Sequence, residues 1–107
     1  MDPYEEITPE ELKACLDAGT APALLDVREP WEHAICALPG ARLIPLDQLE
    51  PRVDEVDPER EVVVYCHHGI RSAAVARWLR HQDVPALNLR GGIDAWSLRI
   101  DRTLRRY

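Results

Sequence analysis

Basic side chains are outnumbered in this sequence of 107 residues: 13 Lys and Arg stand against 19 Asp and Glu, a formal net charge of −6. This acidic balance disfavours nucleic acid and anionic membranes as main partners. No apolar run approaches the ~20 residues that span a bilayer, and the chain start lacks the basic segment and apolar run of a signal peptide. The three cysteines cannot all pair internally, which argues against a disulfide framework. We therefore expect a cytoplasmic protein, either a small enzyme or a small binding module.

Internal repeats and low-complexity tracts are also missing, and the nine prolines are scattered between short segments. We draw no domain boundary and expect residues 1–107 to form a single domain. Hydrophobic residues make up 46% of the chain, which is enough for one core of modest size.

Residues 8–11 have the pattern of a helix start. Thr8 is predicted to cap the helix, Pro9 to occupy its first position, and Glu11 to complete a capping box, with Gly19 as the stop. Short apolar runs and amphipathic segments then alternate along the chain. The predicted strands are residues 23–27, 41–44, 61–65 and 86–90, and the predicted helices are residues 8–19, 47–53, 73–80 and 93–98. This alternation predicts a doubly wound α/β fold, with a mostly parallel sheet of about five short strands and helices on both faces.

Residues 66–72 connect the clearest strand to a strong helix. In an open α/β sheet, ligands collect beyond the carboxyl ends of the strands, and a loop entering a helix directs several N–H groups at one point. Gly69 permits a tight backbone path, Arg71 adds a permanent charge, and Ser72 is expected to cap the helix. These groups favour a thiolate at the start of the loop. We therefore predict that Cys66 is a nucleophile.

This segment resembles the active-site loop of the rhodanese family of sulfurtransferases, and the resemblance extends over nearly the whole chain. Four ordered motifs carry it: residues 25–28 with Glu32, residues 39–41 with 44–45, residues 63–72, and residues 91–96. The chain departs from the family pattern at residues 36–38, where Cys-Ala-Leu replaces the usual Gly-His that precedes the Ile-Pro-Gly-Ala stretch.

The resemblance implies sulfur transfer in two steps. Cys66 would take a sulfane sulfur from a small donor anion such as thiosulfate and hold it as a persulfide. A thiophilic acceptor, which is cyanide in vitro and a thiol or a protein cysteine in the cell, would then remove it. No metal or organic cofactor is implied, since the covalent persulfide is the carrier. The implied anion-binding loop comprises His67, His68, Gly69, Ile70, Arg71 and Ser72.

Two other functions remain open. The scaffold could serve as a binding or regulatory module without turnover, or as a sulfur carrier dedicated to one protein partner. A phosphatase or arsenate reductase is the other alternative. Four residues separate Cys66 from Arg71, whereas the related phosphatases have a loop one residue longer, and this spacing disfavours phosphate chemistry.

Supporting roles are expected for Asp26, Arg28 and Glu32, which follow or end a buried strand. We expect Asp26 and Arg28 to hydrogen-bond neighbouring loops, with Arg28 paired to Glu32. His67 and His68 are expected to shape the pocket mouth and, if protonated, to help hold an anion.

The remaining cysteines and aromatics have simpler interpretations. Cys15 is expected in the core, and Cys36 could be inert, a resolving thiol or a sulfur relay. Trp31 is expected at the core or at the rim of the pocket. His33 and His81 are expected at the surface without partners. The arginine-rich tail, residues 99–107, either packs back on the acidic body or docks an acidic partner.

Overall fold

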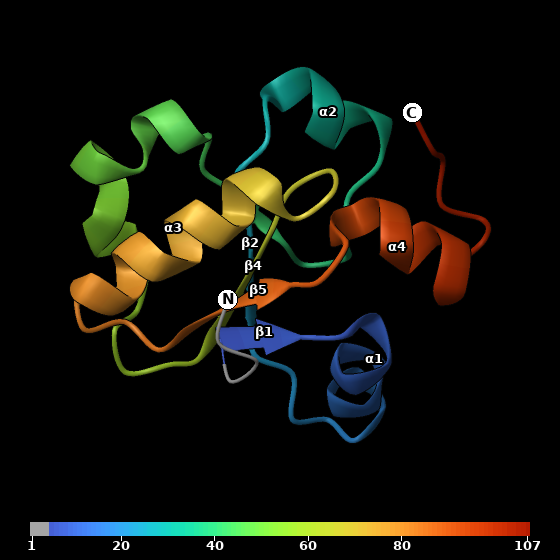
Figure 1. The fold of residues 1–107 in the computed structure, drawn as a ribbon, viewed down its shortest axis with the longest axis horizontal. Helices are drawn as coiled ribbons and strands as arrows, with labels where there is room; N and C mark the ends of the chain where they lie inside the picture. Colours follow the sequence, from blue (N-terminus) through green and yellow to red (C-terminus); the bar gives the residue numbers. More distant parts are fainter. Residues whose placement is uncertain (1–4) are drawn as a thin grey trace.

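The computed structural model describes residues 5–107, so the part of the signal-peptide argument that rests on residues 1–4 lies outside the described residues. Five strands form one sheet: β1 (Glu6–Ile7), β2 (Ala23–Asp26), β3 (Arg42–Leu43), β4 (Val62–Tyr65) and β5 (Ala86–Leu89). Their order is β1-β5-β4-β2-β3, and each of the four pairings is parallel. The predicted α/β fold is thereby confirmed (Figure 1).

Four α-helices and two 3₁₀ segments accompany the strands, and the last helix follows the final strand: α1 (Pro9–Asp17), α2 (Pro30–Ile35), η2 (Leu46–Gln48), η3 (Glu50–Glu55), α3 (Ile70–His81) and α4 (Gly92–Arg99). The predicted capping box is present at α1. The amide of Glu11 donates to Thr8 Oγ1 over 3.1 Å, and the amide of Thr8 donates to Glu11 Oε1 over 2.9 Å. Two orphan donors at the helix end are satisfied in this way.

Strand β4 runs through the middle of the sheet and feeds a core on each face. Val62 and Val64 pack with residues of α3 and of the η3 region on one side. Val63 and Tyr65 pack on the other side with residues of α1 and α4. All four side chains are almost completely buried, which explains why this strand reads as an unbroken apolar run rather than an alternating one.

The helix after β4 begins earlier than predicted, at Ile70 rather than residue 73. Gly69 occupies the N-cap position with φ +96, a conformation that favours glycine. The expectation that Ser72 caps this helix is wrong, because Ser72 lies inside its first turn. Because the glycine supplies the turn, the side chain of Ser72 is not needed as a helix cap.

Three further elements differ from prediction. The helix predicted over residues 47–53 is a pair of 3₁₀ segments, because Pro51 removes a backbone donor and Arg52 adopts a non-helical conformation. Helix α2 was not predicted at all, although Pro30 at its start is a typical signal. Strand β1 has only two residues and therefore carries no alternation that a sequence could reveal.

Helices long and apolar enough to cross a membrane do not occur within residues 5–107.

Gly92 is the position where the fold tolerates no side chain. With φ +64, its added Cβ would overlap the carbonyl oxygens of Cys66 and His67. We expect Gly92→Ala to lower the free energy of unfolding by about 3 kcal/mol or more, because backbone must move. Gly40 is the matched control: φ is +78, and nothing lies within 4 Å of the added Cβ.

Gly40→Ala should cost only about 1–2 kcal/mol, the penalty of the left-handed conformation itself. Urea denaturation of the two variants measures the difference. Equal losses would contradict the close approach of α4 to the segment after β4.

Candidate active site

Cys66 directly follows β4, at the carboxyl edge of the sheet, and its side chain is 1% exposed. Its Sγ accepts hydrogen bonds from the amides of Gly69 and Ser72, over 3.2 and 3.4 Å. The hydroxyl of Ser72 lies 3.3 Å from the same sulfur. Amide donors that converge on one sulfur stabilise its anionic form. We call residues 66–72 the cysteine loop, and its geometry matches the predicted nest around Cys66.

A polar network behind the loop positions Ser72. Its Oγ lies 2.5 Å from Oδ1 of Asn88, on the neighbouring strand β5. The Asn88 amide nitrogen donates to the carbonyl of Gly69 over 3.2 Å, which turns Oδ1 toward the serine. Sequence reasoning missed Asn88. The one sequence signal was a polar residue within an otherwise apolar strand. In the structure Asn88 is 2% exposed, so its polar atoms need partners.

The first turn of α4 holds the outer side of the cysteine loop. The amides of Ile93 and Asp94 donate to the carbonyls of Cys66 and His67, over 3.0 and 3.1 Å. Because these carbonyls point toward α4, the following amides of the loop can turn inward toward the sulfur. The motif at residues 91–96 thus shapes the loop from outside, and it leaves no room for a Cβ at Gly92.

Arg71 does not stand free beside the sulfur. Its guanidinium forms a bidentate pair with Glu32 of α2, with N–O distances of 2.8 and 2.9 Å. This contact lowers the pKa of Glu32 from 4.5 to about 2, and the same carboxylate raises the pKa of Arg71. Both groups are therefore ionised at neutral pH. Arg71 is 39% exposed, while Glu32 is buried.

The expected pairing of Arg28 with the carboxylate of Glu32 is wrong. Arg28 is fully buried and pairs with Asp26, with N–O distances of 2.9 and 2.7 Å. It also donates to the carbonyls of Glu32 and Cys36, so the expected contact with a neighbouring loop is present. The carboxylate of Glu32 is taken by the second arginine, 39 residues further along the chain.

His33 is the second correction near this pair. It was expected to have no partner, but its Nδ1 lies 2.8 Å from Oδ2 of Asp26. The imidazole is 31% exposed and covers one edge of the buried carboxylate.

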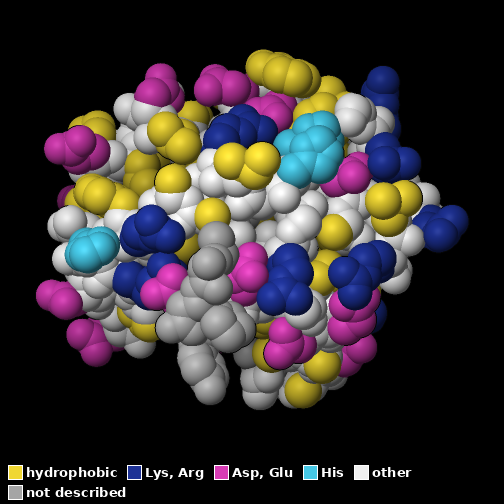
Figure 2. Space-filling view, in the orientation of Figure 1, with side chains coloured by type: hydrophobic (Ala, Val, Ile, Leu, Met, Phe, Trp, Pro, Cys, Tyr) yellow, Lys and Arg dark blue, Asp and Glu magenta, His cyan; other side chains and the backbone are white. Residues whose placement is uncertain are grey.

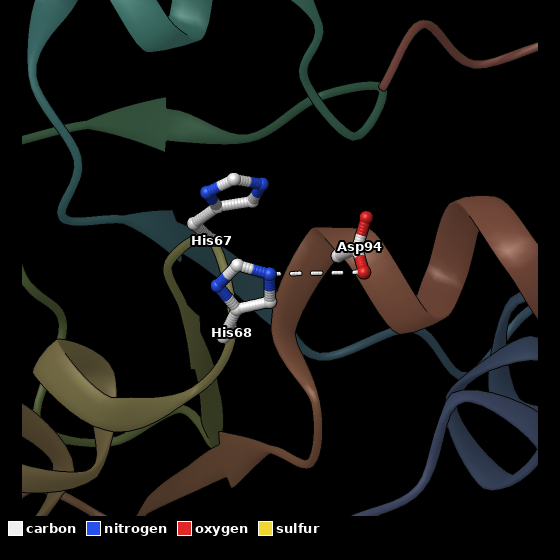
Figure 3. A group of neighbouring side chains, drawn as sticks. All are labelled: His67, His68 and Asp94. Carbon is white, nitrogen blue, oxygen red and sulfur yellow. Dashed lines mark ion pairs between the residues drawn. The ribbon is translucent and has the colours of Figure 1, made fainter. Parts of the chain in front are cut away.

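His67, His68 and Asp94 lie together at the mouth of the site, as Figure 3 shows. Their potential ligand atoms all lie within 4.8 Å of one another, a cluster that the sequence did not predict. The imidazole rings stack with centroids 3.9 Å apart, and Asp94 Oδ1 accepts from Arg106 over 2.9 Å. A metal ion here would have to unstack the rings and compete with the arginine for the carboxylate. Burial and the neighbouring His68 lower the pKa of His67, which disfavours the protonated form that would help to hold an anion.

The tail reaches this mouth and ends with Tyr107 against His67. The two rings are parallel within 8°, with centroids 3.8 Å apart. Trp31 of α2, which is 60% exposed, meets the tyrosine edge-on at 6.0 Å. Of the two interpretations of the tail, packing on the body is confirmed: Leu104 joins the core, and Arg99 pairs with Glu10. Sequence reasoning missed Tyr107, since no motif includes it.

Of the remaining thiols, Cys36 belongs to the surroundings of Arg28, whereas Cys15 lies on α1, apart from these contacts. Cys36 is buried, and its Sγ is 3.9 Å from Nη1 of Arg28. Cys15 is only half-buried, so its expected place in the core is wrong. The helix that carries it is short, and its fully buried residues are Pro9 and Leu12.

One cavity of about 470 Å³ lies at the opposite end of the sheet, near the first residues of β2 and β4. Its lining includes Arg42 and Arg60, whose guanidinium groups contact Glu55 and the carbonyl of Ala21.

Basic and acidic side chains are interspersed over the face of the molecule shown in Figure 2. The acidic excess of the chain therefore does not collect into one patch there.

Comparison with known proteins places this geometry in a family context. The family described as "Rhodanese-like domain" matches residues 8–99. A protein of Allochromatium vinosum named "Sulfurtransferase" is 38% identical over 93 residues, covering 86% of this chain and 87% of that protein. A crystal structure of a "Rhodanese-like Domain Protein" from Staphylococcus aureus is 31% identical, with a TM-score of 0.84, and covers 96% of this chain and 98% of that chain.

A longer relative also matches. The "Rhodanese-like/PpiC domain-containing protein 12, chloroplastic" of Arabidopsis thaliana is 35% identical over 114 residues, which cover 99% of this chain. The chain spans only 38% of the length of that plant protein.

The ion pair between Glu32 and Arg71 gives a testable pH dependence. Because the pKa of Glu32 falls from 4.5 to about 2 on folding, its contribution is fully present above pH 4.5 and is lost as the pH falls toward 2. At neutral pH we expect Glu32→Gln to cost about 2 to 3 kcal/mol, after allowing for screening at the half-exposed arginine.

Denaturation by urea at several pH values measures this cost. The difference between the native protein and Glu32→Gln should shrink by roughly half or more near pH 3. A difference that stays constant with pH would show that the carboxylate carries no stabilising charge.

Proposed function

The chain belongs to the rhodanese-like domain family, and from that premise we propose that it transfers a sulfane sulfur from a small donor anion such as thiosulfate to a thiophilic acceptor, through a persulfide on Cys66. Relatives named as sulfurtransferases support sulfur transfer as the general chemistry. The donor, the acceptor and the persulfide are our proposal.

One observation carries it: the amides of Gly69 and Ser72 converge on the Sγ of Cys66. In the first step, the thiolate attacks the sulfane sulfur of thiosulfate. The new Sγ–S bond forms as the S–S bond of the donor breaks, and sulfite leaves with the electron pair. Charge is conserved, since the thiolate becomes a persulfide anion and the thiosulfate dianion becomes a sulfite dianion.

The first turn of α3 is suited to holding the outer sulfur. Amides in the first turn of a helix have no carbonyl of a preceding turn to bond, so those of Ile70 and Arg71 are available to an anion. These amides provide preorganised dipoles for the negative charge of the outer sulfur. In this proposal they act as part of the anion-binding loop from His67 to Ser72 that the family resemblance implies.

In the second step, an acceptor thiolate or cyanide attacks the outer sulfur. The Sγ–S bond breaks, and its electron pair returns to Cys66 as the thiolate. The amides of Gly69 and Ser72 stabilise the thiolate as it forms. No metal or organic cofactor enters this scheme. The three free thiols are compatible with the reducing, cytoplasmic setting that we propose for the chain.

A thiosulfate labelling experiment tests the proposal. The native protein, treated with thiosulfate and freed of small molecules, should gain one sulfur atom by intact-mass analysis and then yield thiocyanate with cyanide. Cys66→Ser should abolish both signals, because a hydroxyl cannot form the persulfide. Cys15→Ser is the matched control, since Cys15 lies on α1 and should leave both signals unchanged.

The other functions predict different results. A persulfide that forms but does not pass to small acceptors would indicate a dedicated sulfur carrier. Hydrolysis of an aryl phosphate that is lost in Cys66→Ser would favour a phosphatase. Absence of added sulfur in the native protein would refute the proposal.

A further inference from the structure

Tyr107 contacts the cysteine loop although it lies outside every motif. Its ring covers the imidazole of His67, the residue next to Cys66, with centroids 3.8 Å apart. His67 in turn stacks on His68, with ring planes 26° apart, so the three stacked rings form one wall at the mouth of the site. Aromatic rings at this spacing are in van der Waals contact, which leaves no passage between them.

The hydroxyl of Tyr107 reaches the other end of the loop. It donates to Oε1 of Glu32 over 3.0 Å, and that carboxylate holds Arg71. It also accepts from Nη1 of Arg28 over 2.9 Å. One side chain therefore touches the beginning of the cysteine loop directly and its arginine through a single carboxylate.

Contacts along the tail fix this position. Arg106 pairs with Asp94 at 2.9 Å, and the hydroxyl of Ser97 donates to the carbonyl of Leu104 over 2.8 Å. Figure 1 shows the tail running from α4 to the neighbourhood of α2, across the carboxyl edge of the sheet. The ring is thus held from both α2 and α4 and does not lie free on the surface.

Cys66 is 1% exposed, so an acceptor reaches its sulfur only past the side chains that surround the cysteine loop. Displacement at sulfur needs the attacking atom in line with the bond that breaks, so an acceptor must enter along the axis of the persulfide. A linear ion such as cyanide fits a narrow entrance. A bulky thiol must bring its neighbouring atoms past the wall of rings.

On the basis of the proposed function, we propose that Tyr107 is a specificity-determining residue, whose ring makes sulfur transfer from the Cys66 persulfide to a bulky thiol slower than transfer to a narrow acceptor such as cyanide. The ring provides the restriction, and the hydroxyl holds the ring in place through Arg28 and Glu32.

Single-turnover transfer from the preformed persulfide tests this assignment. The protein is loaded with thiosulfate, freed of small molecules, and mixed with either cyanide or glutathione. The readout is the ratio of the two second-order rate constants. This ratio cancels any loss of correctly folded protein, because both acceptors draw on the same persulfide.

We expect Tyr107→Ala to raise the glutathione-to-cyanide ratio roughly tenfold or more, as removal of a steric barrier in a small site would. Tyr107→Phe keeps the ring and should stay within about twofold of the native ratio. Leu98→Ala, which removes an exposed hydrophobic side chain from α4, is the control and should leave the ratio unchanged. If Tyr107→Ala does not fold, Tyr107→Trp must lower the ratio.

Failure of this inference differs from failure of the proposed function. A native protein that transfers sulfur, with a ratio that does not respond to Tyr107→Ala or Tyr107→Trp, would overturn the role of Tyr107 alone. A native protein that forms no persulfide would overturn the proposed function and this inference with it.

Discussion

A guanidinium that is closed off from solvent needs a partner for each of its five N–H groups, and Arg28 finds all of them at the carboxyl edge of the sheet. Asp26 accepts two, the carbonyls of Glu32 and Cys36 accept one each, and the hydroxyl of Tyr107 accepts the last. These partners belong to β2, the α2 region and the tail. Because loss of a buried counter-ion costs about 3–5 kcal/mol, the three segments cannot shift independently of one another. The surroundings of the cysteine loop therefore depend on this one side chain.

The position of α2 also decides how charge is presented to Cys66. Glu32 neutralises Arg71 in a bidentate pair, so the electrostatic stabilisation of the sulfur comes mainly from backbone amides at contact distance. The net charge of −6 acts over a range of only ~8 Å at physiological salt, which makes distant carboxylates weak competitors. An acidic protein can therefore hold a sulfur anion, provided that its loop directs N–H groups inward. Helix α4 ensures this by binding the outward carbonyls.

The sequence predicted those features that depend on near neighbours. The capping box of Thr8, the buried strand β4, and the tight turn at Gly69 each rest on residues within a few positions of one another. Features that depend on distant partners were wrong or missing. Arg28 and Arg71 are equally suitable partners for Glu32 by chemistry, and only the fold brings the second one to it. Strand β1 forms by pairing with the edge of β5, and a strand of two residues is too short to show an alternating pattern in the sequence.

The candidate site divides along the same line. The chemistry at Sγ follows from a short segment whose amides, glycine and serine are adjacent in sequence. Access to that sulfur depends on His67, Tyr107 and α2. These lie far apart in the chain, since 79 positions separate Tyr107 from Arg28, and only the fold brings them into contact. A cysteine loop of the same sequence could sit beneath a different helix and a different tail. The loop motif therefore specifies what reaction the sulfur can undergo, whereas the residues around it specify which molecules can reach the sulfur, and these two properties can change independently.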